Sequence, residues 1–198
     1  NEYEAGSFSD TTTMDAKVIF DLGAIESDGT GASDEDTSFA YSYTMNLNTS
    51  FLDGDDNLYI RLKTGNHDGW MKDKMDGYLS SLGKNSGTIA VDKIWYEFPV
   101  GDNNTVWVGP RIENYYMHGT APSIYKPITK QFALGGNGNA YGASTDTGAG
   151  WAYKADNGFA ISSNIGTKSK STKTVSSSYI DTGLLTNDSK TSWATQIG

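Results

Sequence analysis

The chain of 198 residues has a net charge of −9 at pH 7 and contains no cysteine. The absence of cysteine excludes disulfide scaffolds, thiolate zinc sites and cysteine nucleophiles, and the acidic balance argues against a nucleic-acid partner. Aromatic residues make up 12% and glycines number 23. The chain is therefore too aromatic to be disordered and too rich in glycine to be a helical bundle. The mean hydropathy is −0.51, and no stretch approaches the roughly 18 to 20 apolar residues of a membrane-spanning helix.

Apolar and polar residues alternate with a period of two in eight segments. In the first, residues 12–24, Met14, Val18, Phe20 and Leu22 share one parity. Successive side chains of a strand point to opposite faces, so the pattern predicts a strand with one apolar face. No amphipathic helix pattern competes over any long window. The same alternation predicts strands in residues 38–51, 58–63, 93–98, 105–111, 148–154, 159–166 and 192–197.

Short and long connections between these segments alternate without exception. The short ones are rich in Gly, Asp and Asn, which tolerate turn dihedrals; they are residues 53–57, 101–104 and 156–158. The long ones are residues 25–37, 67–87, 112–146 and 167–190. In an up-and-down sheet, all the short turns then lie at one edge.

This arrangement is typical of outer-membrane β-barrels, in which the apolar parity faces lipid and the polar parity faces the lumen. The predicted fold class is therefore all-β, an up-and-down antiparallel transmembrane β-barrel with about eight strands in this chain. A soluble carbohydrate-binding β-sandwich is the alternative, because it alternates in the same way. Sandwiches, however, use Greek-key crossings, which do not keep the short turns at one end.

Several stretches resemble the cyanobacterial Som-type porins, of the carbohydrate-selective OprB group of outer-membrane porins. The most specific is the hairpin formed by Tyr96-Glu97-Phe98-Pro99-Val100-Gly101 and Val106-Trp107-Val108-Gly109-Pro110-Arg111. The others keep their order along nearly the whole chain and are Tyr3-Glu4-Ala5-Gly6-Ser7-Phe8-Ser9, Thr11-Thr12-Thr13, Leu47-Asn48-Thr49-Ser50-Phe51, Pro122-Ser123-Ile124-Tyr125 and Thr195-Gln196-Ile197-Gly198.

The resemblance implies a barrel of about 16 strands that passes small solutes and ions. Residues 1–11 would be a lead-in segment, and residues 12–198 a partial barrel truncated in or near its eighth strand. It further implies an outer-membrane location, contact with lipid and lipopolysaccharide, and a homotrimer. A segment upstream of this chain would bind peptidoglycan or another wall polymer. A structural tether between the outer membrane and the wall is a second functional hypothesis.

The polar parity carries six basic and three acidic residues that we expect to line the pore. The basic ones are Lys17, Arg61, Lys63, Lys93, Arg111 and Lys154, and the acidic ones are Asp15, Asp21 and Glu97. Charged rings on a pore wall bias which ions pass. The count predicts a modest preference for anions or neutral solutes.

The connection 112–146 is the longest, and loops of this length are usually functional. The resemblance implies that it folds into the lumen and narrows it. The residues expected at this constriction are Arg111, Glu113, Tyr115, Tyr116 and Tyr125. Packing of the loop on the outer rim is the alternative.

No catalytic or metal-binding pattern stands out. His67 and His118 are lone histidines on the long connections, and nucleophile-elbow, phosphate-loop and metalloprotease motifs are absent. Asp53, Asp55 and Asp56 resemble half of a calcium loop, but the closing Glu is missing. We therefore expect no enzyme activity, no cofactor and no metal site.

Overall fold

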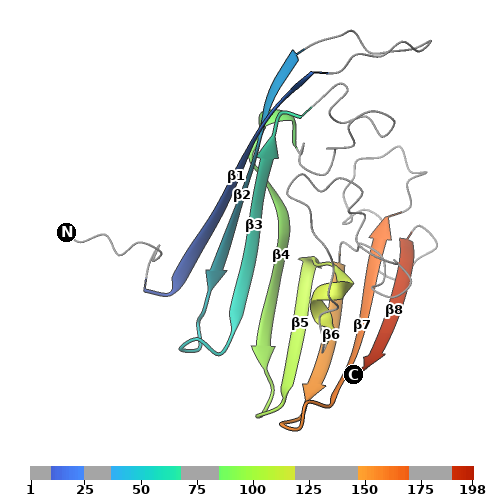
Figure 1. Ribbon diagram of the computed structural model, residues 1–198. Coiled ribbons are helices and arrows are strands. Elements are labelled where there is room, and N and C mark those ends of the chain that lie inside the picture. Colours follow the sequence, from blue (N-terminus) through green and yellow to red (C-terminus); the bar gives the residue numbers. More distant parts are fainter. Residues whose placement is uncertain (1–9, 25–36, 68–84, 119–146, 170–188) are drawn as a thin grey trace.

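The computed structural model describes residues 10–24, 37–67, 85–118, 147–169 and 189–198. These residues form one sheet of eight antiparallel strands, drawn from blue to red in Figure 1. The strands are β1 (Thr12–Ala24), β2 (Thr37–Thr49), β3 (Asn57–Gly65), β4 (Ala90–Pro99), β5 (Asn104–Arg111), β6 (Thr147–Lys154), β7 (Ala160–Ser169) and β8 (Ser189–Ile197), and two short 3-10 helices accompany them, η2 (Asn85–Gly87) and η3 (Asn114–Met117).

Each strand pairs only with its sequence neighbours, so the sheet order is the chain order from β1 to β8. The predicted all-β, up-and-down arrangement and all eight strands are confirmed. The sheet is open, because β1 and β8 lie at its two ends and do not pair with each other (Figure 1). Within the described ranges, neither helix has the length and apolarity needed to cross a bilayer.

The two faces of the sheet differ in chemistry. One carries Phe20, Phe39, Val108 and Trp193, which are half or more exposed; we call it the apolar face. The other carries small and polar residues such as Ser42, Ser162 and Asn164, all buried. Because η3 packs against β6 and β7 on this second side, we call it the η3 face. The segregation follows from the period-two alternation of the sequence.

All three short turns lie at one edge of the sheet, the lower edge in Figure 1. Gly54, Gly101 and Gly158 adopt positive φ angles there, at 102°, 67° and 91°, a region that glycine enters without strain. β2 ends at Thr49, two residues earlier than the alternation predicts. Its extension to Phe51 was wrong because the backbone NH of Phe51 turns to the carboxylate of Asp56.

The register shifts twice, between Arg61 and Leu62 on β3 and between Ile94 and Tyr96 on β4. At the second shift Gly109 lies so close to β4 that an added Cβ would be 2.5 Å from the Cβ of Trp95. Only glycine allows the two strands to approach this closely.

The core lies between η3 and the sheet, where Trp95, Trp107, Ile112, Met117 and Ala152 form one buried cluster. Ile112 and Met117 are fully buried. They rest on glycines of β6: an added Cβ at Gly150 would lie 2.8 Å from both Cβ and Sδ of Met117, and one at Gly148 would lie 3.0 Å from Ile112. Ile112 and Met117, which follow β5, therefore pack on the sheet at positions where only glycine leaves enough room for them.

Candidate functional site

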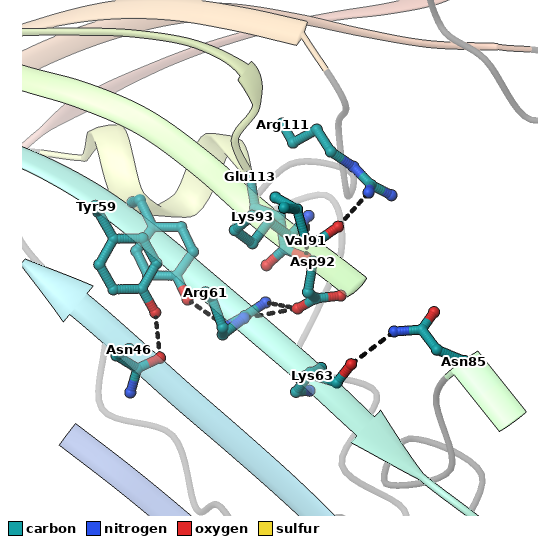
Figure 2. Close-up of polar contacts among 11 residues, drawn as sticks. Asn46, Tyr59, Arg61, Lys63, Asn85, Val91, Asp92, Lys93, Arg111 and Glu113 are labelled. Atoms are coloured by element: carbon teal, nitrogen blue, oxygen red, sulfur yellow. Dashed lines mark hydrogen bonds and ion pairs between the residues drawn. The ribbon is translucent and has the colours of Figure 1, made fainter. Parts of the chain in front are cut away.

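A cluster of charged and aromatic side chains lies on the η3 face, over β3 and β4 and beside η3 (Figure 2). Its first element is Arg61, on β3. Arg61 Nε donates to Asp92 Oδ2 at 2.6 Å, and Nη2 of the same guanidinium is also 2.6 Å from that oxygen. Nη1 donates to the hydroxyl of Tyr116 at 3.1 Å. Arg61 therefore connects β3 to β4 and to η3.

The second element is an ion pair between Lys93 on β4 and Glu113, which precedes η3. Lys93 Nζ lies 2.8 Å from Glu113 Oε1, and their side chains are only 8% and 15% exposed. Few solvent molecules reach such a pair, so salt screens it less than a surface pair. It fixes the start of η3 to the sheet.

The third element is an aromatic stack. The ring of Tyr59 lies 4.0 Å from that of Trp95, Trp95 lies 4.6 Å from Tyr116, and Tyr116 lies 4.5 Å from Tyr115, measured between centroids. Tyr59 also donates its hydroxyl proton to Asn46 Oδ1 at 2.8 Å (Figure 2). Tyr115 is the most exposed of the four, so the stack runs from the sheet toward open space.

The structure brings five of the predicted site residues into one neighbourhood. Arg61, Lys93, Glu113, Tyr115 and Tyr116 all belong to the cluster or to its stack. Tyr125 lies outside the described residues, as does the rest of the 112–146 connection beyond His118.

Other predicted pore-lining residues lie apart from the cluster. Lys17 and Asp15 are exposed on the end strand β1, and Lys154 is exposed beside the turn between β6 and β7. Lys63 is buried on β3, where its carbonyl accepts from Asn85 Nδ2 at 2.8 Å (Figure 2). Glu97 accepts the indole proton of Trp107 at 2.8 Å.

Arg111 departs from the simple parity. The register shift places Arg111 opposite Ile94, and Ile94 belongs to the set of alternating β4 residues on the apolar face. The Arg111 guanidinium donates to the backbone carbonyl of Val91 (Figure 2).

His67 has a partner that the sequence did not suggest. Its Nε2 lies 2.7 Å from Oδ2 of Asp21 on β1. The description of His67 as a lone histidine was wrong, because the small Ala40 of the intervening β2 lets the two longer side chains meet.

Asp92 and Trp95 were not singled out from the sequence, although they hold the cluster together, and neither was Trp107, which shares the buried core with Trp95. Trp95 and Trp107 share the parity of Lys93 and Glu97, which was the available signal. Asp92 has the opposite parity, and the nearby register shift between Arg61 and Leu62 accompanies its contact with Arg61.

Within the described ranges, no three His, Asp or Glu residues are grouped closely enough to hold a metal ion. Asp56, from the half calcium loop, instead accepts hydrogen bonds from Ser50 Oγ at 2.7 Å and from two backbone amides. The cluster on the η3 face can bind ions and polar solutes electrostatically and can offer aromatic faces.

Searches against protein-family models, curated proteins and solved structures give no match to this chain.

Proposed function

We propose that this chain forms part of the wall of a water-filled outer-membrane channel for passive diffusion of small hydrophilic solutes or ions. The observation that carries the proposal is the division of one up-and-down sheet into an exposed apolar face and a polar η3 face. In such a channel the apolar face contacts lipid and the η3 face contacts water.

The apolar face fits a lipid surface better than water. Its exposed side chains include Phe20, Leu22 and Phe39, which are 69%, 73% and 68% exposed. They continue across the sheet through Val108 and Ile165 to Trp193, which is 78% exposed. Soluble monomers rarely expose an apolar patch of more than a few hundred Å², so a partner for this face is required.

The η3 face fits the wall of a selective pore. Arg61 and Lys93 carry charge there, but Asp92 and Glu113 neutralise much of it. Lys17 and Lys154 add exposed positive charge, and Asp15 adds one exposed negative charge. We infer a modest preference for anions or neutral solutes, since the remaining fixed charge of a pore wall biases ion passage.

The proposal includes features that belong to a whole channel. Further strands would close the open sheet into a barrel, three copies would form a homotrimer, and an upstream segment would bind peptidoglycan. Lipid and lipopolysaccharide would cover the apolar face. A tether between the outer membrane and the wall would need the same barrel, but it would need no open pore.

Reconstitution of the chain into planar bilayers, together with the further strands or copies that close its sheet, tests the proposal. Discrete conductance steps with a reversal potential near zero or on the anion side are expected across a potassium chloride gradient. A bilayer that stays silent while the protein is inserted favours the tether. A compact monomer that is soluble without detergent favours the carbohydrate-binding β-sandwich, although the described strands form one sheet and not two.

A further inference from the structure

Two basic residues directly oppose each other on the η3 face. Arg61 of β3 pairs in register with Lys93 of β4. Like charges directly opposite on neighbouring strands destabilise a sheet, and the two side chains are only 14% and 8% exposed. The two positive charges are therefore stable side by side only if negatively charged groups lie close to them.

The two carboxylates that meet this requirement come from different parts of the chain. Asp92 belongs to β4 itself and binds Arg61. Glu113 precedes η3 as its N-terminal cap residue, yet its side chain makes no capping hydrogen bond. Its carboxylate instead contacts Lys93 Nζ at 2.8 Å. Figure 2 shows Glu113 reaching Lys93 beside the Arg61–Asp92 pair.

η3 does not depend on Glu113 alone for its position. Met117 and Ile112 are fully buried against the glycines of β6, and Tyr116 stacks on Trp95. The backbone of Glu113 is extended, at φ −99° and ψ 135°, so it is not strained. η3 therefore keeps these other contacts with the sheet if the carboxylate leaves Lys93.

We propose that Lys93, with Arg61 beside it, forms a binding site for a small monovalent anion such as formate or chloride. The Glu113 carboxylate occupies this site as a tethered ligand, and anions from the lumen compete with it. The inference rests on the proposed function, because exchange requires water at the η3 face. The site would bind an anion at one place on the η3 face, in addition to the general effect of the wall's charge on ion passage.

Removal of the tethered carboxylate tests the site by chemical rescue. In Glu113→Ala, the buried Lys93 loses its counter-charge and space opens beside it, so a small anion should bind there. Thermal unfolding of the purified full chain in detergent is followed by circular dichroism in sodium formate and in sodium gluconate at equal ionic strength. We expect formate to raise the variant's unfolding midpoint, with half-saturation at a concentration roughly tenfold or more below that of the wild type.

Two controls separate binding from general salt effects. Asp102→Ala removes one carboxylate from an exposed turn at the sheet edge and should respond to formate as the wild type does. Lys93→Met with Glu113→Ala removes both partners and should lose the response. An equal response to formate and gluconate, or a response that survives in the double variant, overturns the site.

The readout separates this inference from the proposed function, since it needs no conduction. A formate response in a protein that never conducts leaves the site standing and defeats the channel. Conduction without a formate response does the reverse. If Glu113→Ala does not fold, the same formate titration is made on Glu113→Gln, whose unfolding midpoint should rise with formate more than that of Asp102→Asn, and equal responses overturn the site.

Discussion

Asp56 holds the turn between β2 and β3 with a single carboxylate. Oδ1 accepts from Ser50 Oγ and from the backbone amides of Phe51 and Leu52, and Oδ2 accepts from the hydroxyl of Tyr96 at 2.5 Å. Burial by itself would raise the pKa of this carboxyl, but the hydrogen bonds from Tyr96, Ser50 and the backbone outweigh it and lower the pKa well below its ordinary value. The charged form is thus the one that the turn requires.

The lowered pKa of Asp56 predicts a pH dependence of stability. A carboxyl whose pKa is lower in the folded than in the unfolded chain contributes stability fully above its unfolded pKa of about 3.9, and loses it as the pH falls toward the folded value. In Asp56→Asn, this contribution should be missing at pH 7. Denaturant unfolding at pH 7 and pH 3 should therefore show a variant less stable than the wild type at pH 7, with a smaller gap at pH 3.

Asp102→Asn, in the exposed turn between β4 and β5, is the matched control and should be about as stable as the wild type at pH 7. A gap between Asp56→Asn and the wild type that stays constant over this pH range would contradict the assignment of the turn to the charged carboxylate.

At the scale of elements, η3 packs on the sheet through contacts between large side chains and glycines. Met117 lies over Gly150, and Ile112 lies over Gly148. The helix has only four residues, too few to be stable by its own hydrogen bonds. Its position is therefore determined by packing against β6 and β7 and by the contacts of Glu113 and Tyr116.

Gly150→Ala should displace η3 from the sheet. The new Cβ would lie 2.8 Å from the Cβ of Met117 and 2.9 Å from that of Asn164, so a backbone has to shift, at a cost of about 1–3 kcal/mol. Urea unfolding in detergent would measure this loss. Ala149→Ser also adds one heavy atom, on the exposed face of the same strand, and should change the unfolding free energy by less than about 0.5 kcal/mol. Equal effects of the two substitutions would contradict the docking.

Strands were predictable from sequence because alternation is a local property. The alternation alone assigns Phe20, Leu22 and Trp193 to the apolar face. Register shifts were not, since the extra residue between Val108 and Arg111 on β5, opposite Ile94–Tyr96, leaves no trace in composition. For this reason the partners of Arg111 and Arg61 were missed. The expectation that Glu113, Tyr115 and Tyr116 act together came from a family resemblance, and their mutual contact depends on the fold of residues 112–117 over the sheet.

At the scale of the whole molecule, the two faces of the sheet should respond oppositely to charge. Val18 and Ile19 are neighbours on β1: Val18 lies on the apolar face and is 49% exposed, whereas Ile19 pairs with Ser42 on the η3 face. If the apolar face contacts lipid, Val18→Lys should cost about 2–4 kcal/mol when the residue lies near the bilayer midplane. Ile19→Lys should cost less, because its charge enters water.

Unfolding of both variants from lipid vesicles by urea would measure the difference. In water, an exposed Val18→Lys would be nearly neutral. A Val18→Lys variant as stable as the wild type in vesicles would therefore contradict a lipid-facing surface.

The sheet of the described strands is open, because β1 and β8 remain unpaired with each other. The exposed edges present unpaired backbone groups, which cannot face hydrocarbon without cost. A membrane channel built on this sheet therefore needs further strands or copies to complete it, and alternation within one chain carries no information about them.

The most direct test of a lipid-facing apolar face and a water-facing η3 face is the labelling of single cysteines, which the cysteine-free chain permits without background. Val18→Cys and Ile19→Cys would be reconstituted separately in vesicles and treated with a charged, membrane-impermeant maleimide. The channel predicts fast labelling at position 19 and little at position 18, with both labelled after denaturation. Equal labelling of the two positions, or faster labelling at 18, would contradict it.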